Sequence, residues 1–296
     1  MLLESNSKLD LKLRDIDLPT QVGLDDVKIK MHTVGICGSD IHYYEHGKIG
    51  QWKVNEPMVL GHEGSGTVID IGKNEKNLKT GDRVCIEPQV VSKKTKEYKL
   101  GIYNYDQKVK FWATPPIHGC LTPEVVFPGV MVFKIPDSLS YAEGAMVEPL
   151  AVGMQGVTKA QIKPGQIGLV MGCGPIGLVT ALTALAGGCS NVYIADILSE
   201  KLKICEHYSG LVPVDLSKEN LSEKIMNDTN GWGVDRFFEC SGAVKAYESI
   251  FNCCSPGAHV VLIGNNSEPV PMDWAVLFSK GLEYHTVHRY SHQYEP

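Results

Sequence analysis

Apolar and polar positions follow two different patterns along this chain of 296 residues. In the first half, the apolar runs are short and lie between closely spaced turn residues. The segment 27–31 alternates as a half-buried strand does, and the segment 64–72 resembles a strand that begins and ends with glycine. We therefore expect an all-β or barrel-like domain in this half of the chain.

After Gly165 the pattern changes, and apolar runs alternate with segments that are long enough to form helices. This order is typical of a parallel sheet whose strands are joined by crossover helices. The expected strands are 167–171, 192–195, 211–214, 234–239, 259–263 and 282–287. They make up a complete dinucleotide-binding sheet. The length predicts two domains, which we place at 1–151 and 152–296.

The composition excludes several classes of function. A net charge of −6 with both signs interspersed, and no basic stripe, argues against nucleic acid as a partner. The N-terminus lacks the features of a secretory signal, and no apolar run is long enough to span a bilayer, so we expect a cytoplasmic protein without a membrane partner. Nine cysteines without a Cys-x-x-Cys pair indicate reduced thiols.

A glycine-rich turn follows the first strand of the expected parallel sheet. Gly172, Gly174 and Gly177 stand in a G-x-G-x-x-G spacing before a helix-like segment, 178–186. The first glycine permits a tight turn, the second lets the backbone approach a pyrophosphate, and the third allows the helix to pack on the strand. This context predicts a dinucleotide site; the alternative is a glycine turn without a cofactor.

The second expected strand of this sheet ends at an acidic residue, Asp196. A carboxylate there can accept hydrogen bonds from the adenosine ribose, and it would repel the 2′-phosphate of NADP. We therefore predict NAD, although Lys201 lies close enough in sequence to weaken the discrimination.

Three residues of the first half form a set of zinc ligands: Cys37, His62 and Glu63. Three protein ligands leave a fourth position for water or substrate, as catalytic zinc requires. Because His62 and Glu63 are adjacent, both reach one ion only from an irregular loop, which Gly61 and Gly64 make feasible. The alternative is a buried cysteine and a core histidine that are unrelated to each other.

Other polar residues lie near these ligands in sequence. His42 and His46 follow Cys37 with a spacing that indicates a mobile loop, and neither is expected to bind the metal. Glu148 precedes the expected domain boundary, where clefts form, and is placed to contact the metal through water. The alternative role for Glu148 is a carboxylate at the start of a helix, with Pro149 in the first turn.

With these motifs, the chain resembles the zinc-containing medium-chain alcohol dehydrogenase superfamily, and within it the sorbitol-type polyol dehydrogenases. The resemblance covers nearly the whole chain. It rests on the segments Val34–Tyr43, Pro57–Glu63, Ala113–Pro116, Glu148–Leu150 and Arg289–Tyr290.

The resemblance implies an α/β fold with a GroES-like, β-rich catalytic domain and a Rossmann domain with a doubly wound parallel sheet. It implies one catalytic Zn²⁺ per chain, held by Cys37, His62 and Glu63 with water, and Glu148 beside that water. Residues implied to contact the polyol are Ser39, Tyr43, Phe111, Arg289 and Tyr290. Residues implied to contact NAD, besides the glycines, are Ile176, Asp196, Lys201, Ile263, Gly264, Asn265, Val287, His288 and Arg289.

The chain departs from the superfamily in two places. Many members bind a structural zinc through four cysteines in the lobe near residues 89–110, and here that lobe contains none. We expect a solvated, lysine-bearing surface lobe, with binding of an anionic partner as the alternative. The chain also ends shortly after Tyr290, whereas relatives continue. A C-terminally shortened chain of this kind would expose apolar surface and lose stability.

The predicted function is NAD-dependent oxidation of a secondary alcohol on a polyol such as sorbitol or xylitol, with zinc as Lewis acid. Within the enzyme class, the alternative is a zinc dehydrogenase for L-threonine or another secondary alcohol. Outside it, the alternatives are a nucleotide-binding protein without catalysis and a subunit-interface role for the strand 282–287. The resemblance implies a homo-oligomer, a dimer or a tetramer.

Overall fold

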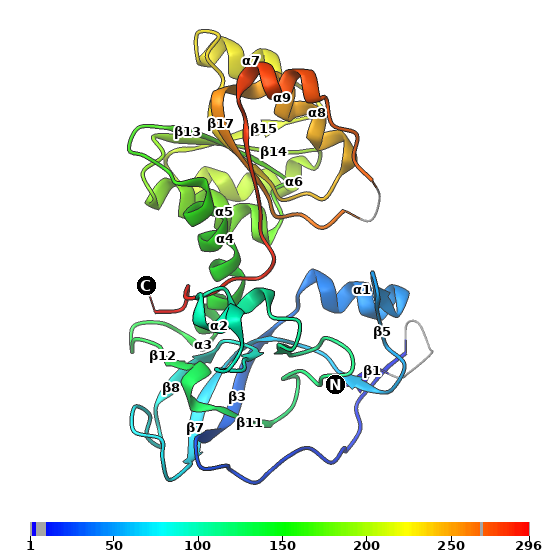
Figure 1. Ribbon diagram of the computed structural model, residues 1–296, viewed down its shortest axis with the longest axis vertical. Coiled ribbons are helices and arrows are strands. Elements are labelled where there is room, and N and C mark those ends of the chain that lie inside the picture. Colours follow the sequence, from blue (N-terminus) through cyan, green and yellow to red (C-terminus); the bar gives the residue numbers. More distant parts are fainter. Residues whose placement is uncertain (1, 4–9, 267–268, 296) are drawn as a thin grey trace. The chain divides into compact units, whose positions relative to one another are not determined.

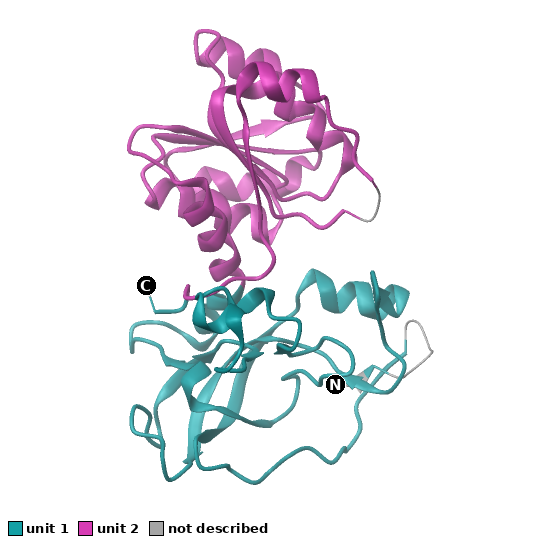
Figure 2. Cartoon of the chain, in the orientation of Figure 1, with its two compact units in different colours: residues 1–148, 294–296 teal, residues 149–293 magenta. Residues whose placement is uncertain are grey.

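The computed structural model describes residues 2–3, 10–266 and 269–295. The chain divides into two compact units, residues 1–148 with 294–296 and residues 149–293, which are coloured separately in Figure 2. Unit 1 and unit 2 each have their own sheet and their own core.

Unit 1 is built on a five-stranded antiparallel sheet with the order β11-β3-β7-β8-β12. These strands are β3 (Asp26–Gly35), β7 (Glu63–Ile71), β8 (Arg83–Ile86), β11 (Glu124–Pro128) and β12 (Val132–Lys134). Alternate residues of β3, such as Val27 and Ile29, are fully buried, as the predicted half-buried strand requires. The first half of the chain is therefore β-rich, as its pattern predicts.

Short elements complete unit 1. The short strands are β1 (Leu2–Leu3), β2 (Leu11–Lys12), β4 (Lys48–Ile49), β5 (Trp52–Lys53), β6 (Met58–Val59), β9 (Gln89–Val90) and β10 (Lys110–Phe111). The helices are α1 (Gly38–His46), α2 (Lys96–Lys99), η1 (Tyr103–Tyr105), η2 (Gly129–Met131) and α3 (Tyr141–Ala145).

Unit 2 contains a six-stranded parallel sheet with the order β15-β14-β13-β16-β17-β18. The strands are β13 (Ile167–Met171), β14 (Asn191–Asp196), β15 (Leu211–Asp215), β16 (Val234–Glu239), β17 (Cys254–Leu262) and β18 (Glu283–Thr286). All six match predicted strands. The strand order reverses direction after β13, which gives the doubly wound topology.

Helices cover both faces of this sheet (Figure 1). They are α4 (Val147–Ala160), α5 (Pro175–Ala186), α6 (Ser199–Leu202), η3 (Lys203–His207), α7 (Leu221–Asp228), η4 (Val244–Tyr247), α8 (Glu248–Cys253) and α9 (Trp274–Lys280). Phe237 of β16 packs with α7 and α8 on one face, whereas the next residue, Phe238, packs with α4 and α5 on the other. The GroES-like and Rossmann fold class is thereby confirmed. None of the helices in the described ranges has the length and apolar character needed to cross a bilayer.

The prediction of a mobile loop around His42 and His46 is wrong, because both residues lie in helix α1. The backbone N–H of Cys37 donates to the side chain of Asp40 at the start of this helix. At its end, Gly47 adopts a left-handed conformation, and its N–H donates to the carbonyl of Tyr43. Caps at both ends stabilise a short polar helix that lacks an apolar stripe.

The cysteine-free lobe has exposed lysines, as predicted, but it also has a buried interior. Glu87, just before the lobe, accepts hydrogen bonds from Tyr103 (2.8 Å) and Gln89 (3.0 Å), and all three side chains are buried. Burial raises the pKa of Glu87 to about 7. Side-chain packing and this hydrogen-bonded network therefore hold the lobe without four metal ligands.

Candidate zinc centre and cofactor site

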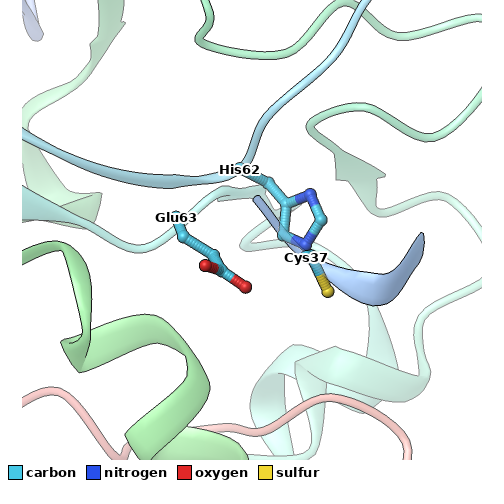
Figure 3. A group of neighbouring side chains, drawn as sticks. All are labelled: Cys37, His62 and Glu63. Carbon is cyan, nitrogen blue, oxygen red and sulfur yellow. The ribbon is translucent and has the colours of Figure 1, made fainter. Parts of the chain in front are cut away.

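Cys37, His62 and Glu63 converge in unit 1 (Figure 3). One ligand atom from each side chain lies within 4.8 Å of the others. Cys37 precedes α1, His62 lies in the loop before β7, and Glu63 is the first residue of that strand. A sulfur, an imidazole nitrogen and a carboxylate oxygen at these separations fit a single zinc ion with a fourth position available.

Two glycines make this convergence possible. Gly61 has a φ of +88°, so the chain turns sharply just before His62 and Glu63, as the irregular-loop prediction requires. Gly35 pairs with Glu63 across the sheet, and a Cβ atom there would lie 2.0 Å from a carboxylate oxygen of Glu63. Gly64, by contrast, lies within β7 and has no positive φ.

Asp40 is a site residue for which the sequence motif suggested no role. Its buried carboxylate accepts hydrogen bonds from the backbone N–H groups of Cys37 (3.1 Å) and Gly61 (3.0 Å). Asp40 therefore connects the two separate segments that supply the predicted metal ligands. The first bond follows from its position three residues after Cys37, but the second depends on the tertiary fold.

The electrostatics of this cluster favour a bound cation. Burial raises the pKa of the Cys37 thiol to about 12, two hydrogen bonds from Ser39 to the sulfur lower it, and the charges of Glu148 and Glu63 raise it. Burial also raises the pKa of Glu63, a hydrogen bond from Cys37 lowers it, and the charge of Asp40 raises it. A divalent cation would relieve this crowding of buried acidic groups, so the residues fit zinc.

The structure places the other predicted residues of unit 1 as follows. Phe111 is buried against His62, with 5.4 Å between the ring centres. Glu148 is buried in the first turn of α4, so it has the helix-start position of the alternative role as well as an electrostatic influence on Cys37. Tyr43 is buried in a small cluster with Leu3, Val54, Met58 and Leu60.

Arg289 and Tyr290 belong to unit 2, just after β18. Arg289 has a φ of +56°, which is uncommon for a residue other than glycine. Tyr290 has no exposed surface. Val287 continues the pairing of β18, because its N–H donates to the carbonyl of Leu262 at 2.9 Å.

The glycine turn in unit 2 has the geometry that each glycine was predicted to supply. Gly172 has a φ of +96°, and a Cβ on Gly177 would lie 1.8 Å from the carbonyl oxygen of Gly172. Gly174 is the N-cap of α5, and a Cβ on it would meet no atom within 4 Å. The space beside Gly174 and the free N–H groups of the helix suit a pyrophosphate.

Asp196 lies at the end of β14, beside the glycine turn. Its carboxylate accepts hydrogen bonds from the N–H groups of Cys173 (2.8 Å) and Leu198 (2.9 Å), and the amine of Lys201 lies 3.9 Å away. A cavity of about 560 Å³ opens there. Its lining includes the predicted residues Gly172, Gly174, Asp196 and Lys201, and also Ser241, Ala243 and Lys245, which were not predicted.

The remaining residues predicted to contact the cofactor lie at the same edge of the sheet. Ile263, Gly264 and Asn265 follow β17, and the N–H groups of Ile263 and Gly264 both donate to the carbonyl of Glu239. His288 follows β18, and Ile176 is in the first turn of α5. Because carboxyl ends of parallel strands share one edge, the structure brings these segments together there.

Comparisons with known proteins agree with this architecture. The family model of the alcohol dehydrogenase GroES-like domain matches residues 23–137, and that of the zinc-binding dehydrogenases matches residues 175–296. D-xylulose reductase of Morganella morganii is 50% identical over 295 residues, covering 99% of this chain and 86% of that protein. The chain belongs to the zinc-dependent D-xylulose reductase and sorbitol dehydrogenase family.

Two further proteins show how broad the similarity is. Sorbitol dehydrogenase of Homo sapiens is 38% identical over 261 residues, which cover 88% of this chain and 73% of that protein. The crystal structure of 2R,3R-butanediol dehydrogenase from Bacillus subtilis has a TM-score of 0.88 at 29% identity. The match covers 99% of this chain and 84% of the butanediol dehydrogenase chain. The similarity therefore extends from sequence to fold.

Proposed function

We propose that this protein catalyses the reversible, NAD-dependent oxidation of a secondary alcohol of xylitol or sorbitol to the ketose. The observation that carries the proposal is the convergence of Cys37, His62 and Glu63 in a chain half identical to a D-xylulose reductase. When bound, zinc supplies a Lewis acid for the substrate hydroxyl, and NAD supplies the hydride acceptor.

The residues of the chain prepare this chemistry. Ser39 donates to the sulfur of Cys37, which favours the thiolate form that binds metal. Phe111 shields one side of His62 and excludes water from it. The hydroxyl proton passes to water near Glu148, which is buried and electrostatically coupled to Cys37, or near Ser39.

A polyol requires several hydrogen-bonding groups, in contrast to a simple aliphatic alcohol. We assign this role to Tyr43, Glu148 and Arg289, together with Ser39 and Tyr290. Asp196 favours NAD, because its carboxylate at the end of β14 repels a 2′-phosphate. Lys201, whose amine lies near that carboxylate, reduces this preference without reversing it.

The proposal also includes a homo-oligomer and a cytoplasmic location. The edge strand β18 has one neighbour in its sheet, β17, so its other side can pair with a second copy in a dimer or tetramer. All nine cysteines are free, as expected for a reducing compartment such as the cytoplasm.

The test is an initial-rate assay of the zinc-loaded chain on xylitol, sorbitol, L-threonine and ethanol, with NAD and NADP in parallel. We expect the highest kcat/KM for a polyol with NAD. A higher kcat/KM for L-threonine or ethanol would show that a polyol is not the substrate. Binding of NADH and one equivalent of zinc without turnover of any alcohol would show a nucleotide-binding protein instead.

A further inference from the structure

A second group of metal-ligating side chains lies in unit 2, at the edge of the parallel sheet. His259 belongs to β17, and Glu283 and His285 belong to β18. One ligand atom from each lies within 4.8 Å of the others. In the part of the chain that the structure describes, only this group and Cys37–His62–Glu63 meet that criterion.

The register of the two strands brings these side chains together. β17 and β18 are parallel, with His259 opposite Glu283 and Val261 opposite His285. Side chains two residues apart point to the same face of a strand. All three ligands therefore project from one face of the sheet, the face on which Val261 packs with α4 and α5.

The separation of the two imidazole nitrogens matches that in a metal site. Nδ1 of His259 lies 3.2 Å from Nε2 of His285, and the two rings stack with centres 5.2 Å apart. Two imidazole nitrogens bound to one tetrahedral zinc, each at about 2.0–2.1 Å, stand roughly 3.4 Å apart. The carboxylate of Glu283 lies 3.5 Å from the other ring nitrogen of His259, Nε2, so this exposed side chain would have to rotate to join an ion held between Nδ1 of His259 and His285. The paired imidazoles thus already have the separation of two ligands.

One of these candidate ligands, His259, is buried, and another, Glu283, is exposed to solvent. His259 is buried, with 9% of its surface exposed, and its strand has neighbours on both sides. Glu283 lies on the edge strand, and 60% of its side chain is exposed. An ion can therefore enter from solvent, and water can fill the remaining coordination position. Two imidazoles and one carboxylate suit Zn²⁺, Co²⁺ or Ni²⁺ better than Mg²⁺ or Ca²⁺.

We propose that His259, Glu283 and His285 form a second site for a divalent transition metal, separate from the Cys37 centre. The ion joins the edge strand β18 to β17 through side chains as well as backbone. β18 leads directly into Val287, His288 and Arg289, so the ion stabilises the strand that presents these residues. Arg236 of β16 lies opposite His259 in the strand register. Its positive charge lowers the affinity of the site for a cation.

Equilibrium dialysis of the full chain against Zn²⁺, with metal counted by mass spectrometry, tests the site. We expect two equivalents in the wild type and one each in Cys37→Ser and His285→Gln. The matched control His207→Gln, an exposed histidine of η3 outside both groups, retains two. When Cys37→Ser is loaded with Co²⁺, we expect the ion at the second site to give d–d bands without thiolate charge-transfer absorption. Binding of Co²⁺ should also raise the Tm of Cys37→Ser, and this rise should be absent in the double variant Cys37→Ser/His285→Gln.

A second test variant guards against misfolding of His285→Gln. Glu283→Gln changes an exposed carboxylate, and we expect it to weaken the second equivalent about tenfold or more. The proposal is overturned if the wild type binds one equivalent, all of it lost in Cys37→Ser. It is equally overturned if Glu283→Gln and His285→Gln both leave the second equivalent unchanged. In those cases the three side chains form a hydrogen-bonded group without a metal.

Discussion

The proposed zinc centre of unit 1 and the glycine turn of unit 2 are built differently. The centre takes its ligands from two separate segments, around Cys37 and around His62, which Asp40 ties together. The turn comes from six consecutive residues, and its key contact joins Gly172 to Gly177. A site of the first kind depends on tertiary structure, whereas the second is fixed by local backbone geometry. Substitutions should therefore affect the two sites in different ways.

Removal of a metal ligand should have the greatest effect on activity. We expect His62→Ala to lose stoichiometric zinc at unit 1 and all detectable turnover, because two remaining ligands hold the ion weakly. NADH binding at unit 2 should remain. His46→Gln, an exposed histidine of α1, is the matched control. Metal analysis and kcat/KM decide the outcome, and normal zinc content with a normal rate in His62→Ala would reject the ligand assignment.

The glycine turn offers a matched pair of substitutions. Gly177→Ala places a methyl group 1.8 Å from the carbonyl oxygen of Gly172, so unit 2 should lose about 3 kcal/mol of stability. Gly174→Ala meets no atom within 4 Å, so the fold should persist while NADH binds about tenfold more weakly, since the methyl group occupies the pyrophosphate space. Thermal unfolding and NADH fluorescence separate the two effects. Equal losses of stability in both variants would contradict this account.

Asp40 connects the ligand segments without being a ligand. Asp40→Asn leaves one carbonyl oxygen to serve two N–H donors and removes a negative charge near His62. We expect zinc affinity to fall about 10- to 100-fold, with secondary structure unchanged. Competition with a chelator measures the affinity, and circular dichroism checks the fold. Wild-type affinity in Asp40→Asn would show that the backbone alone positions the ligands.

Glu87 should give a smaller, pH-dependent effect. Its folded pKa, raised by burial from 4.5 to about 7, means that the folded protein binds the proton more tightly than the unfolded chain. Its contribution to stability is therefore complete below pH 4.5 and is lost as the pH rises to 7, by at most about 3 kcal/mol. The difference in unfolding free energy between wild type and Glu87→Gln should follow this slope. A difference that is independent of pH would rule it out.

Local patterns predicted the β-rich half, the parallel sheet and the candidate ligands, and the family resemblance added the GroES-like fold. Period-two alternation in β3 predicted a β-rich first half, the apolar runs of β13 to β18 predicted the parallel sheet, and the glycine spacing predicted the turn. Helix α1 was missed because it has no apolar stripe and depends on its caps at Asp40 and Gly47. Periodicity detects only helices that bury one face.

Features that depend on pairing across the fold were beyond the sequence. The bond from Gly61 to Asp40 joins a loop to helix α1 through the tertiary fold. The pairing of His259 with Glu283 follows from the register of β17 and β18. The buried network of Glu87, Gln89 and Tyr103 involves two residues of the lobe 89–110, whose lysines suggested a solvated surface or an anionic partner. Exposed charges on a lobe say little about the side chains beneath them.

X-ray absorption at the zinc edge, on the chain loaded with one equivalent of zinc, tests the Cys37–His62–Glu63 centre most directly. We predict one sulfur at about 2.3 Å and nitrogen or oxygen neighbours at about 2.0–2.2 Å, with the sulfur lost in Cys37→Ser. A shell without sulfur in the wild type, or one with several sulfurs, would contradict the account.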